Sequence, residues 1–147
     1  MSETIVIAEL SKGKMSQTTN ELVTAANKLG TNCTIIVPCS DSSIANDATK
    51  ISGATKVIAA KSDVFANYDA AAWAEAIDTV APSGIIITSA SAQSKDLAAR
   101  IAARRSISVI QDVISIDGTT LSTPIYSGKA IQNVSFNGDA VISVRAN

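Results

Sequence analysis

The chain has 147 residues, of which 46% are hydrophobic and 17% are charged, and its formal net charge is -1. This composition is typical of one well-buried globular domain, large enough to bury roughly two thirds of the surface that its unfolded chain exposes. It excludes a disordered tail and suggests neither nucleic acid nor an anionic membrane as a partner.

Five short segments rich in Val, Ile and Thr are nearly continuous in apolar character, as strands buried on both faces should be. They are residues 4–8, 33–38, 55–60, 84–89 and 108–110. Helical patterns separate these segments. A repeated strand-helix-strand unit with right-handed crossovers predicts a doubly wound α/β fold. We expect a mainly parallel five-stranded sheet with helices on both faces, in a single domain over residues 1–147.

Four helices are expected between these strands. They are predicted near residues 18–30, 41–53, 69–81 and 94–105. The first helix has a capping-box pattern at 18–21 and a left-handed cap at Gly30. Arginines gather toward the end of the fourth helix, where they either complement the helix dipole or form a binding patch, and we favour the dipole. They are Arg100, Arg104 and Arg105.

The pattern changes beyond residue 110. Asp117-Gly118 and Asn137-Gly138 are each flanked by residues that favour strands. Such pairs are the strongest short signal for a hairpin. We therefore expect a small antiparallel sheet, and not another crossover helix, at the end of the domain.

The sequence contains no histidine and two cysteines, Cys33 and Cys39. The usual base of serine and cysteine hydrolases is therefore missing, as is the usual imidazole ligand of zinc and haem. The cysteines flank one strand-like run, about 20 Å apart, which is too far for a disulfide, and two are too few for an iron-sulfur cluster. We expect no metal site and no catalytic residues, and a hydrolase built from Ser, Asp and Lys is the least favoured reading.

Ligands of open parallel sheets lie outside the carboxyl ends of the strands, which points to the loop after the fourth strand, residues 88–96. Ser91, Ser94 and Lys95, with the free amides of a helix start, could hold an anion or a phosphate. Helix-capping serines explain the same residues without a ligand, so both readings stay open. The loop contains no glycine, and no Walker-type phosphate loop occurs in the chain.

No apolar run approaches the roughly 20 residues that a membrane span needs. The first residues contain no basic region and lead into a strand-like run instead of a signal-peptide core. We expect a cytoplasmic protein without membrane insertion.

Several segments, in order along the chain, resemble the electron transfer flavoprotein alpha subunit. The most specific are the run 95–97 with Arg100 three residues later, the pair Asp112-Val113, and the run 124–130, Pro-Ile-Tyr-Ser-Gly-Lys-Ala. Less specific are the opening run 5–9 with Gly13-Lys14, and the helix 21–30. Together they span nearly the whole chain, although Ser94 and Ala99 stand where that family commonly has glycine and proline.

The resemblance implies an adenine nucleotide alpha hydrolase-like fold and a place in an FAD protein that takes electrons from dehydrogenases. In that family the flavin is held mainly by a second domain, and the first domain pairs with a similarly folded beta subunit. We therefore expect a scaffold and assembly domain, an electron carrier subunit and not an enzyme, with FAD in the assembled complex and none bound tightly by this chain alone.

Tyr126 and Lys129 are the candidates for contact with the beta subunit or the flavin-binding domain, because they lie in a turn-rich segment near the end of the sequence. A tyrosine that merely closes the small sheet is the alternative. The beta subunit of the family binds AMP with the loop after its fourth strand, to which Ser91, Ser94 and Lys95 correspond. A stand-alone adenine-nucleotide-binding module, which could form a homo-oligomer, is therefore the second hypothesis.

Overall fold

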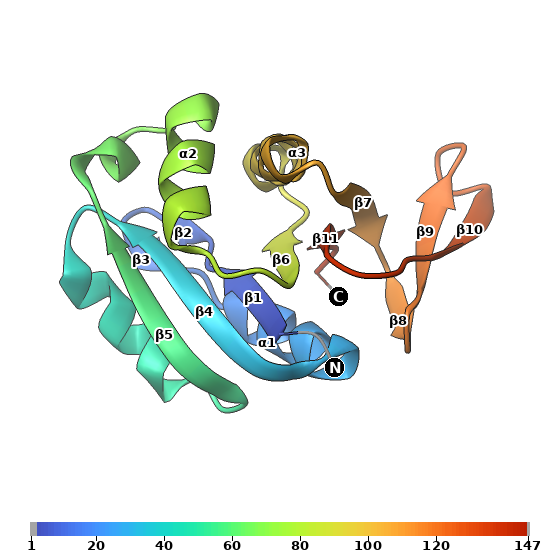
Figure 1. Ribbon diagram of the computed structural model, residues 1–147, viewed down its shortest axis with the longest axis horizontal. Coiled ribbons are helices and arrows are strands. Elements are labelled where there is room, and N and C mark those ends of the chain that lie inside the picture. The colour runs from blue at the N-terminus through green and yellow to red at the C-terminus, as the bar shows by residue number, and fades with distance from the viewer. Residues whose placement is uncertain (1–2, 147) are drawn as a thin grey trace.

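The central feature of the molecule is a parallel sheet of six strands. The computed structural model describes residues 3–146, so the ends of the predicted domain, residues 1–2 and 147, lie outside it. In spatial order the strands are β5 (Ala54–Lys61), β4 (Thr31–Cys39), β1 (Glu3–Ile7), β6 (Ile85–Ser89), β11 (Ala140–Val144) and β7 (Ser108–Val113). All neighbours in this order are parallel, and helices cover both faces (Figure 1), which confirms the predicted doubly wound fold.

Two apolar clusters hold the helices against the sheet. One face packs against α1 (Thr18–Leu29) and the 3-10 helix η1 (Ser42–Lys50), and the other packs against α2 (Ala70–Val80), α3 (Ala92–Arg105) and the short 3-10 helix η2 (Asp63–Ala66). Successive strand residues point to opposite faces, so Val6 joins the first cluster, while Ile5 and Ile7 join the second. This alternation explains why the strands carry unbroken apolar runs.

The sheet contains one strand more than predicted. β11 lies between β6 and β7 and is parallel to both. Four of its five residues are buried, which is the pattern of a central strand and not of a hairpin arm. The hairpin predicted at Asn137-Gly138 is therefore wrong: Gly138, with φ +79°, lies in the turn that leads the chain from the small sheet back into the central one.

The predicted antiparallel sheet is present and has three strands, β8 (Ser115–Asp117), β9 (Thr120–Ile125) and β10 (Ala130–Ser135). Its first turn is the hairpin predicted at Asp117-Gly118. The small sheet stands beyond β7, at one end of the molecule (Figure 1). Leu121 of β9 is fully buried and belongs to the first cluster, so the small sheet is anchored on one side.

Two details at the helix ends differ from expectation. The capping box at 18–21 does not form, because the residue before α1 is Gln17, which makes no side-chain cap; Ser16 Oγ instead accepts the Thr18 hydroxyl at 3.0 Å. Gly30 is extended, with φ -169°, and is not a left-handed cap. The helix predicted near Asp41 is a 3-10 helix, capped by the Asp41 carboxylate.

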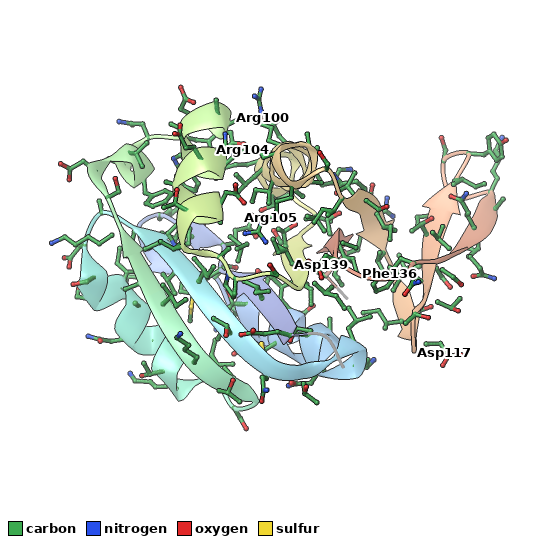
Figure 2. The ribbon with its side chains drawn as sticks, in the orientation of Figure 1. Arg100, Arg104, Arg105, Asp117, Phe136 and Asp139 are labelled. Atoms are coloured by element: carbon green, nitrogen blue, oxygen red, sulfur yellow. The ribbon has the colours of Figure 1, made fainter. Side chains whose placement is uncertain are left out.

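The arginines of α3 lie on the side that faces α2 (Figure 2). Arg105 is bonded to the Asp78 carboxylate and donates to the carbonyls of Asp78, Ala81 and Pro82. Arg104 also reaches Asp78, at 3.4 Å. These contacts satisfy carbonyls at the carboxyl end of α2, so Arg105 caps the neighbouring helix and not its own.

A short hairpin follows β1. Its strands are β2 (Leu10–Ser11) and β3 (Lys14–Met15). Lys12 and Gly13 form the turn with positive φ at both central residues, as a tight hairpin requires.

Candidate functional site

A crevice lies where the strand order reverses. From β1 the chain moves outward through β4 to β5, and then returns to place β6 on the other side of β1. Such a switch point separates the loops at the carboxyl ends of the two central strands, which is where open parallel sheets bind ligands. Here the loop after β1 consists of Ala8 and Glu9, and the loop after β6 begins with Ala90 and Ser91.

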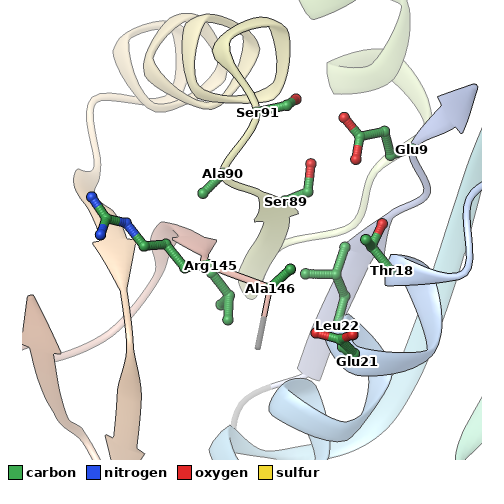
Figure 3. A pocket seen from close by; sticks show the side chains of 10 residues that line it. Glu9, Thr18, Glu21, Leu22, Ser89, Ala90, Ser91, Arg145 and Ala146 are labelled. Carbon is green, nitrogen blue, oxygen red and sulfur yellow. The ribbon is translucent and has the colours of Figure 1, made fainter.

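A large cavity, of about 420 Å³, lies in this crevice (Figure 3). Its wall combines hydroxyls, carboxylates and one guanidinium with apolar side chains. The polar lining residues are Glu9, Thr18, Glu21, Ser89, Ser91 and Arg145. Figure 3 shows Glu9, Thr18, Ser89 and Ser91 around the opening. The size and mixed lining suit a small organic molecule.

The three predicted phosphate-binding side chains all have partners within the protein. Ser91 Oγ accepts from the amide of Ser94 at 3.2 Å and so caps α3. The Ser94 hydroxyl accepts from Ser89 Oγ at 2.9 Å, and Lys95 Nζ donates to the Asp112 carboxylate at 2.8 Å. Of the three, only Ser91 lines the large cavity. Their binding of a nucleotide stays a prediction.

Asp112 is a charged residue whose role the sequence did not reveal. It lies in an irregularity of the pairing between β7 and β11, with φ +61° in the left-handed region. Its carboxylate accepts from Lys95 and, at 3.2 Å, from Arg145 Nε, while its amide donates to Ser143 Oγ at 2.9 Å. The hydrogen bond from Lys95, followed by that from Arg145, holds the pKa of Asp112 below its usual value.

We name the three charged residues Lys95, Asp112 and Arg145 the Asp112 cluster. It ties the first turn of α3 to the ends of β7 and β11. Gln111 adds a second tie, because its amide Nε2 donates to the Lys95 carbonyl at 2.9 Å. Arg145 also lines the large cavity and a smaller one of about 170 Å³ beside α1. In the sequence, Lys95 and Asp112 were noted for the family resemblance of the runs 95–97 and 112–113, and nothing indicated that they would pair.

The cavity lining does not fit FAD. The Glu9 carboxylate in the lining would repel a pyrophosphate, and the cation of the lining, Arg145, is bonded to Asp112. Lys95, the cation nearest the loop, is held by Asp112. The described residues therefore supply no cradle for the flavin cofactor, and we derive no chemistry from one here.

Both cysteines and the single tryptophan lie in the core of the described part of the chain. Cys33 and Cys39 are both buried free thiols, as expected, and burial raises the pKa of each. No group of three or more metal-binding side chains occurs among residues 3–146. Trp73, which is buried, donates its indole N–H to the Val64 and Asn67 carbonyls and is a core residue, as predicted.

The turn between β9 and β10 carries the predicted contact residues. Tyr126 is 77% exposed, and Lys129 is also exposed. Tyr126 and Ser127 have φ values of +52° and +56°, and Gly128 follows at +83°. The Gly128 amide donates to the Ile125 carbonyl at 3.1 Å, and the Lys129 amide donates to the Tyr126 carbonyl at 3.2 Å.

Comparison with known proteins assigns the chain to a family. Residues 4–147 match the family described as "Electron transfer flavoprotein domain". The chain belongs to the electron transfer flavoprotein family. The alpha subunit from Mycobacterium tuberculosis (strain ATCC 25618 / H37Rv) is 31% identical over 99% of the chain and 48% of its own length. The mitochondrial alpha subunit from Arabidopsis thaliana is 32% identical over 92% of the chain and 40% of its own length.

The flavoprotein relatives are longer than this chain. The alpha subunit from Paracoccus denitrificans is 30% identical over 88% of the chain and 43% of its own length. The chain thus spans about half the length of the curated relatives it matches, and it corresponds to the amino-terminal domain of the alpha subunit. These relatives are named for electron transfer and not for an enzymatic reaction. Within residues 3–146, none of the helices has both the length and the apolar character of a membrane span.

Proposed function

We propose that this domain is a scaffold and assembly domain of an electron transfer flavoprotein alpha subunit. In this role it takes part in electron transfer from dehydrogenases through FAD that is held mainly by a domain outside this chain. It acts as part of an electron carrier, and not as an enzyme, through a surface and not through catalytic side chains. A cytoplasmic location stays a prediction.

The observation that carries this proposal is a concentration of exposed apolar side chains at one end of the molecule. Six large hydrophobic residues among those described are exposed, and four of them belong to β7, the small sheet or the segments between: Val109, Ile114, Tyr126 and Ile131. Exposed apolar side chains gathered in one region mark interaction sites more often than scattered ones do. The match to the alpha subunit supports a protein partner of the same assembly.

The partners in this proposal are an electron transfer flavoprotein beta subunit and a flavin-binding domain. Tyr126 and Lys129 are the proposed contact residues, because both are exposed in the turn that joins β9 and β10. The hydroxyl and ring of a tyrosine suit an interface, since the ring supplies apolar area and the hydroxyl a hydrogen bond.

Co-expression tests this proposal. The chain would be produced with the beta subunit from the same source, and the complex would be sought by size-exclusion chromatography with light scattering. We expect a one-to-one complex that survives purification. A chain that stays unbound at micromolar concentrations of both subunits would count against assembly. A strong flavin absorption band in the purified chain alone would contradict the assignment of FAD to another domain.

A second candidate function is favoured by the position of the large cavity at the switch point between β1 and β6. Adenine-nucleotide binding by a stand-alone module would use this crevice with Ser91, the N-cap of α3, and with Ser94 and Lys95 in the first turn of that helix. Calorimetry of the chain with AMP, ATP and FAD separates the two functions. Micromolar binding of AMP or ATP supports the module, and no binding supports the scaffold.

A further inference from the structure

The tip between β9 and β10 has a backbone conformation that its residues rarely adopt. Tyr126 and Ser127 both have positive φ, whereas glycine, asparagine and aspartate are the residues that occupy such turn positions at little cost. In the run 126–128, only the third residue, Gly128, adopts positive φ at little cost. Strain of this type persists only where surrounding structure or function requires it, and it clusters at binding sites.

Packing within the domain does not account for the strain. The Tyr126 side chain is 77% exposed, and no hydrogen bond or ring contact of it occurs within the described residues. The other tyrosine behaves differently: Tyr68 donates its hydroxyl to Asp96 at 3.0 Å and packs edge-on against Trp73. The Tyr126 ring thus contributes nothing visible to the fold that displays it.

The left-handed backbone does have a geometric effect. Two hydrogen bonds close the turn, from Gly128 to Ile125 and from Lys129 to Tyr126, so the tip has a defined shape. A tyrosine on a preformed turn loses little conformational freedom when it binds, because the ring has two side-chain torsions. Lys129 lies in the same turn, and Ile131, 55% exposed, follows on β10.

We propose that Tyr126 is the anchor residue of the assembly interface, held by the strained turn for insertion into an apolar pocket of the beta subunit. The pocket supplies an acceptor for the phenol hydroxyl, and a carboxylate beside it pairs with Lys129. An acidic and apolar partner is favoured because the charge of the tip is Lys129 alone. This inference rests on the proposed assembly function, and it names the residue and the partner chemistry.

The test is a binding titration of the intact chain with the purified beta subunit, in the wild type and in four variants. Tyr126→Ala should weaken the affinity by about thirtyfold, as expected for an anchor. Tyr126→Phe keeps the ring and should lose about fivefold. Lys129→Ala should lose a few-fold, mainly at low salt. Val80→Ala is the matched control on α2, where Val80 is 39% exposed, and it should bind as the wild type does.

The two proposals fail in different ways. If the wild type does not bind the beta subunit, the proposed function and the anchor both fall. If the wild type binds and Tyr126→Ala binds equally well, with an unchanged melting temperature, the anchor alone is overturned.

Ser127→Gly tests the strained turn separately. The variant relieves one left-handed position, so it should melt about 2 °C higher and bind a few-fold more weakly, because the tip loses its fixed shape. A variant that gains stability and binds as well as the wild type would refute the role given to the backbone.

Discussion

The substitution Asp112→Asn isolates the charge of the Asp112 cluster. Asparagine tolerates the left-handed backbone as aspartate does, so the change removes the carboxylate without adding strain. The hydrogen bond to Lys95, at 2.8 Å, is charge-assisted and worth about 1.5 kcal/mol, since the Lys95 side chain is only 37% exposed. Arg145 is 51% exposed, so its bond adds about 0.5 kcal/mol.

We therefore expect Asp112→Asn to lower the free energy of unfolding at pH 7 by about 2 kcal/mol, and the melting temperature by about 6 °C. Urea unfolding followed by circular dichroism measures the difference. Lys95→Met should cost nearly as much as Asp112→Asn, whereas Arg145→Met should cost about 0.5 kcal/mol. The control is Arg100→Gln, which removes an exposed pair with Asp96 and should change stability by under about 0.5 kcal/mol.

The stabilisation by the Asp112 carboxylate should depend on pH in a defined direction. The pKa of Asp112 is lowered in the folded state, so its contribution is fully present above the unfolded value of about 3.9. It is lost as the pH falls from that value through the folded pKa. The stability difference between wild type and Asp112→Asn should therefore be constant from pH 5 to 7 and shrink below about pH 4. A difference under about 0.5 kcal/mol at pH 7, or one that does not shrink in acid, would refute the reasoning.

Three further predictions concern the fold. Arg105→Met removes a guanidinium from a side chain that is only 16% exposed. The Asp78 carboxylate and the carbonyls at the end of α2 then lose this donor, so the free energy of unfolding, measured in urea, should fall by about 3 kcal/mol. Gly84→Ala places a methyl group 2.3 Å from the Glu3 carbonyl oxygen and should cost about 3 kcal/mol, whereas Gly118→Ala meets open space at φ +59° and should cost about 1 kcal/mol. Burial, and then the bond to a carboxylate, raises the pKa of Tyr68 to about 12; a Tyr68→Phe variant should lose that late step of an ultraviolet titration.

The sequence predicted those parts of the fold in which burial imposes a simple hydrophobic pattern on the chain. Strands buried on both faces appear as unbroken apolar runs, and β1, β4, β5 and β6 were all found in this way. β11 was missed because its apolar run follows Asn137-Gly138, and a turn signal does not say which sheet the next strand joins. That choice depends on the space between β6 and β7, which no local pattern contains.

The candidate site was less predictable for a related reason. The loop after β6 could be located from the topology, and Ser91 does line the cavity there. The partners of Ser94 and Lys95 could not be predicted, because Asp112 is 17 residues from Lys95 and meets it only through a left-handed turn in β7. An aspartate in that conformation leaves no mark in the sequence that distinguishes it from one in a regular strand.

The two proposed functions make opposite demands on Lys95. As part of an assembly domain, Lys95 serves to hold α3 against β7 through Asp112. As a phosphate ligand it must leave Asp112 and turn toward the cavity, which costs the bond between them. Asp112→Asn releases Lys95, so a nucleotide site in this crevice should bind AMP at least about tenfold more tightly in the variant, a gain of about 1.4 kcal/mol.

Asp112→Asn therefore also tests nucleotide binding, because that function requires Lys95 to leave Asp112. Calorimetry with AMP would compare wild type and Asp112→Asn at a temperature where both are folded, with Asp112→Asn/Lys95→Met as the control in which any gain must vanish. No binding of AMP in either protein would remove the nucleotide function, because the one contact that competes for the lysine has been taken away. What then remains for the loop after β6 is the role that its contacts already show: Ser91 caps α3, and Lys95 secures it to the strand.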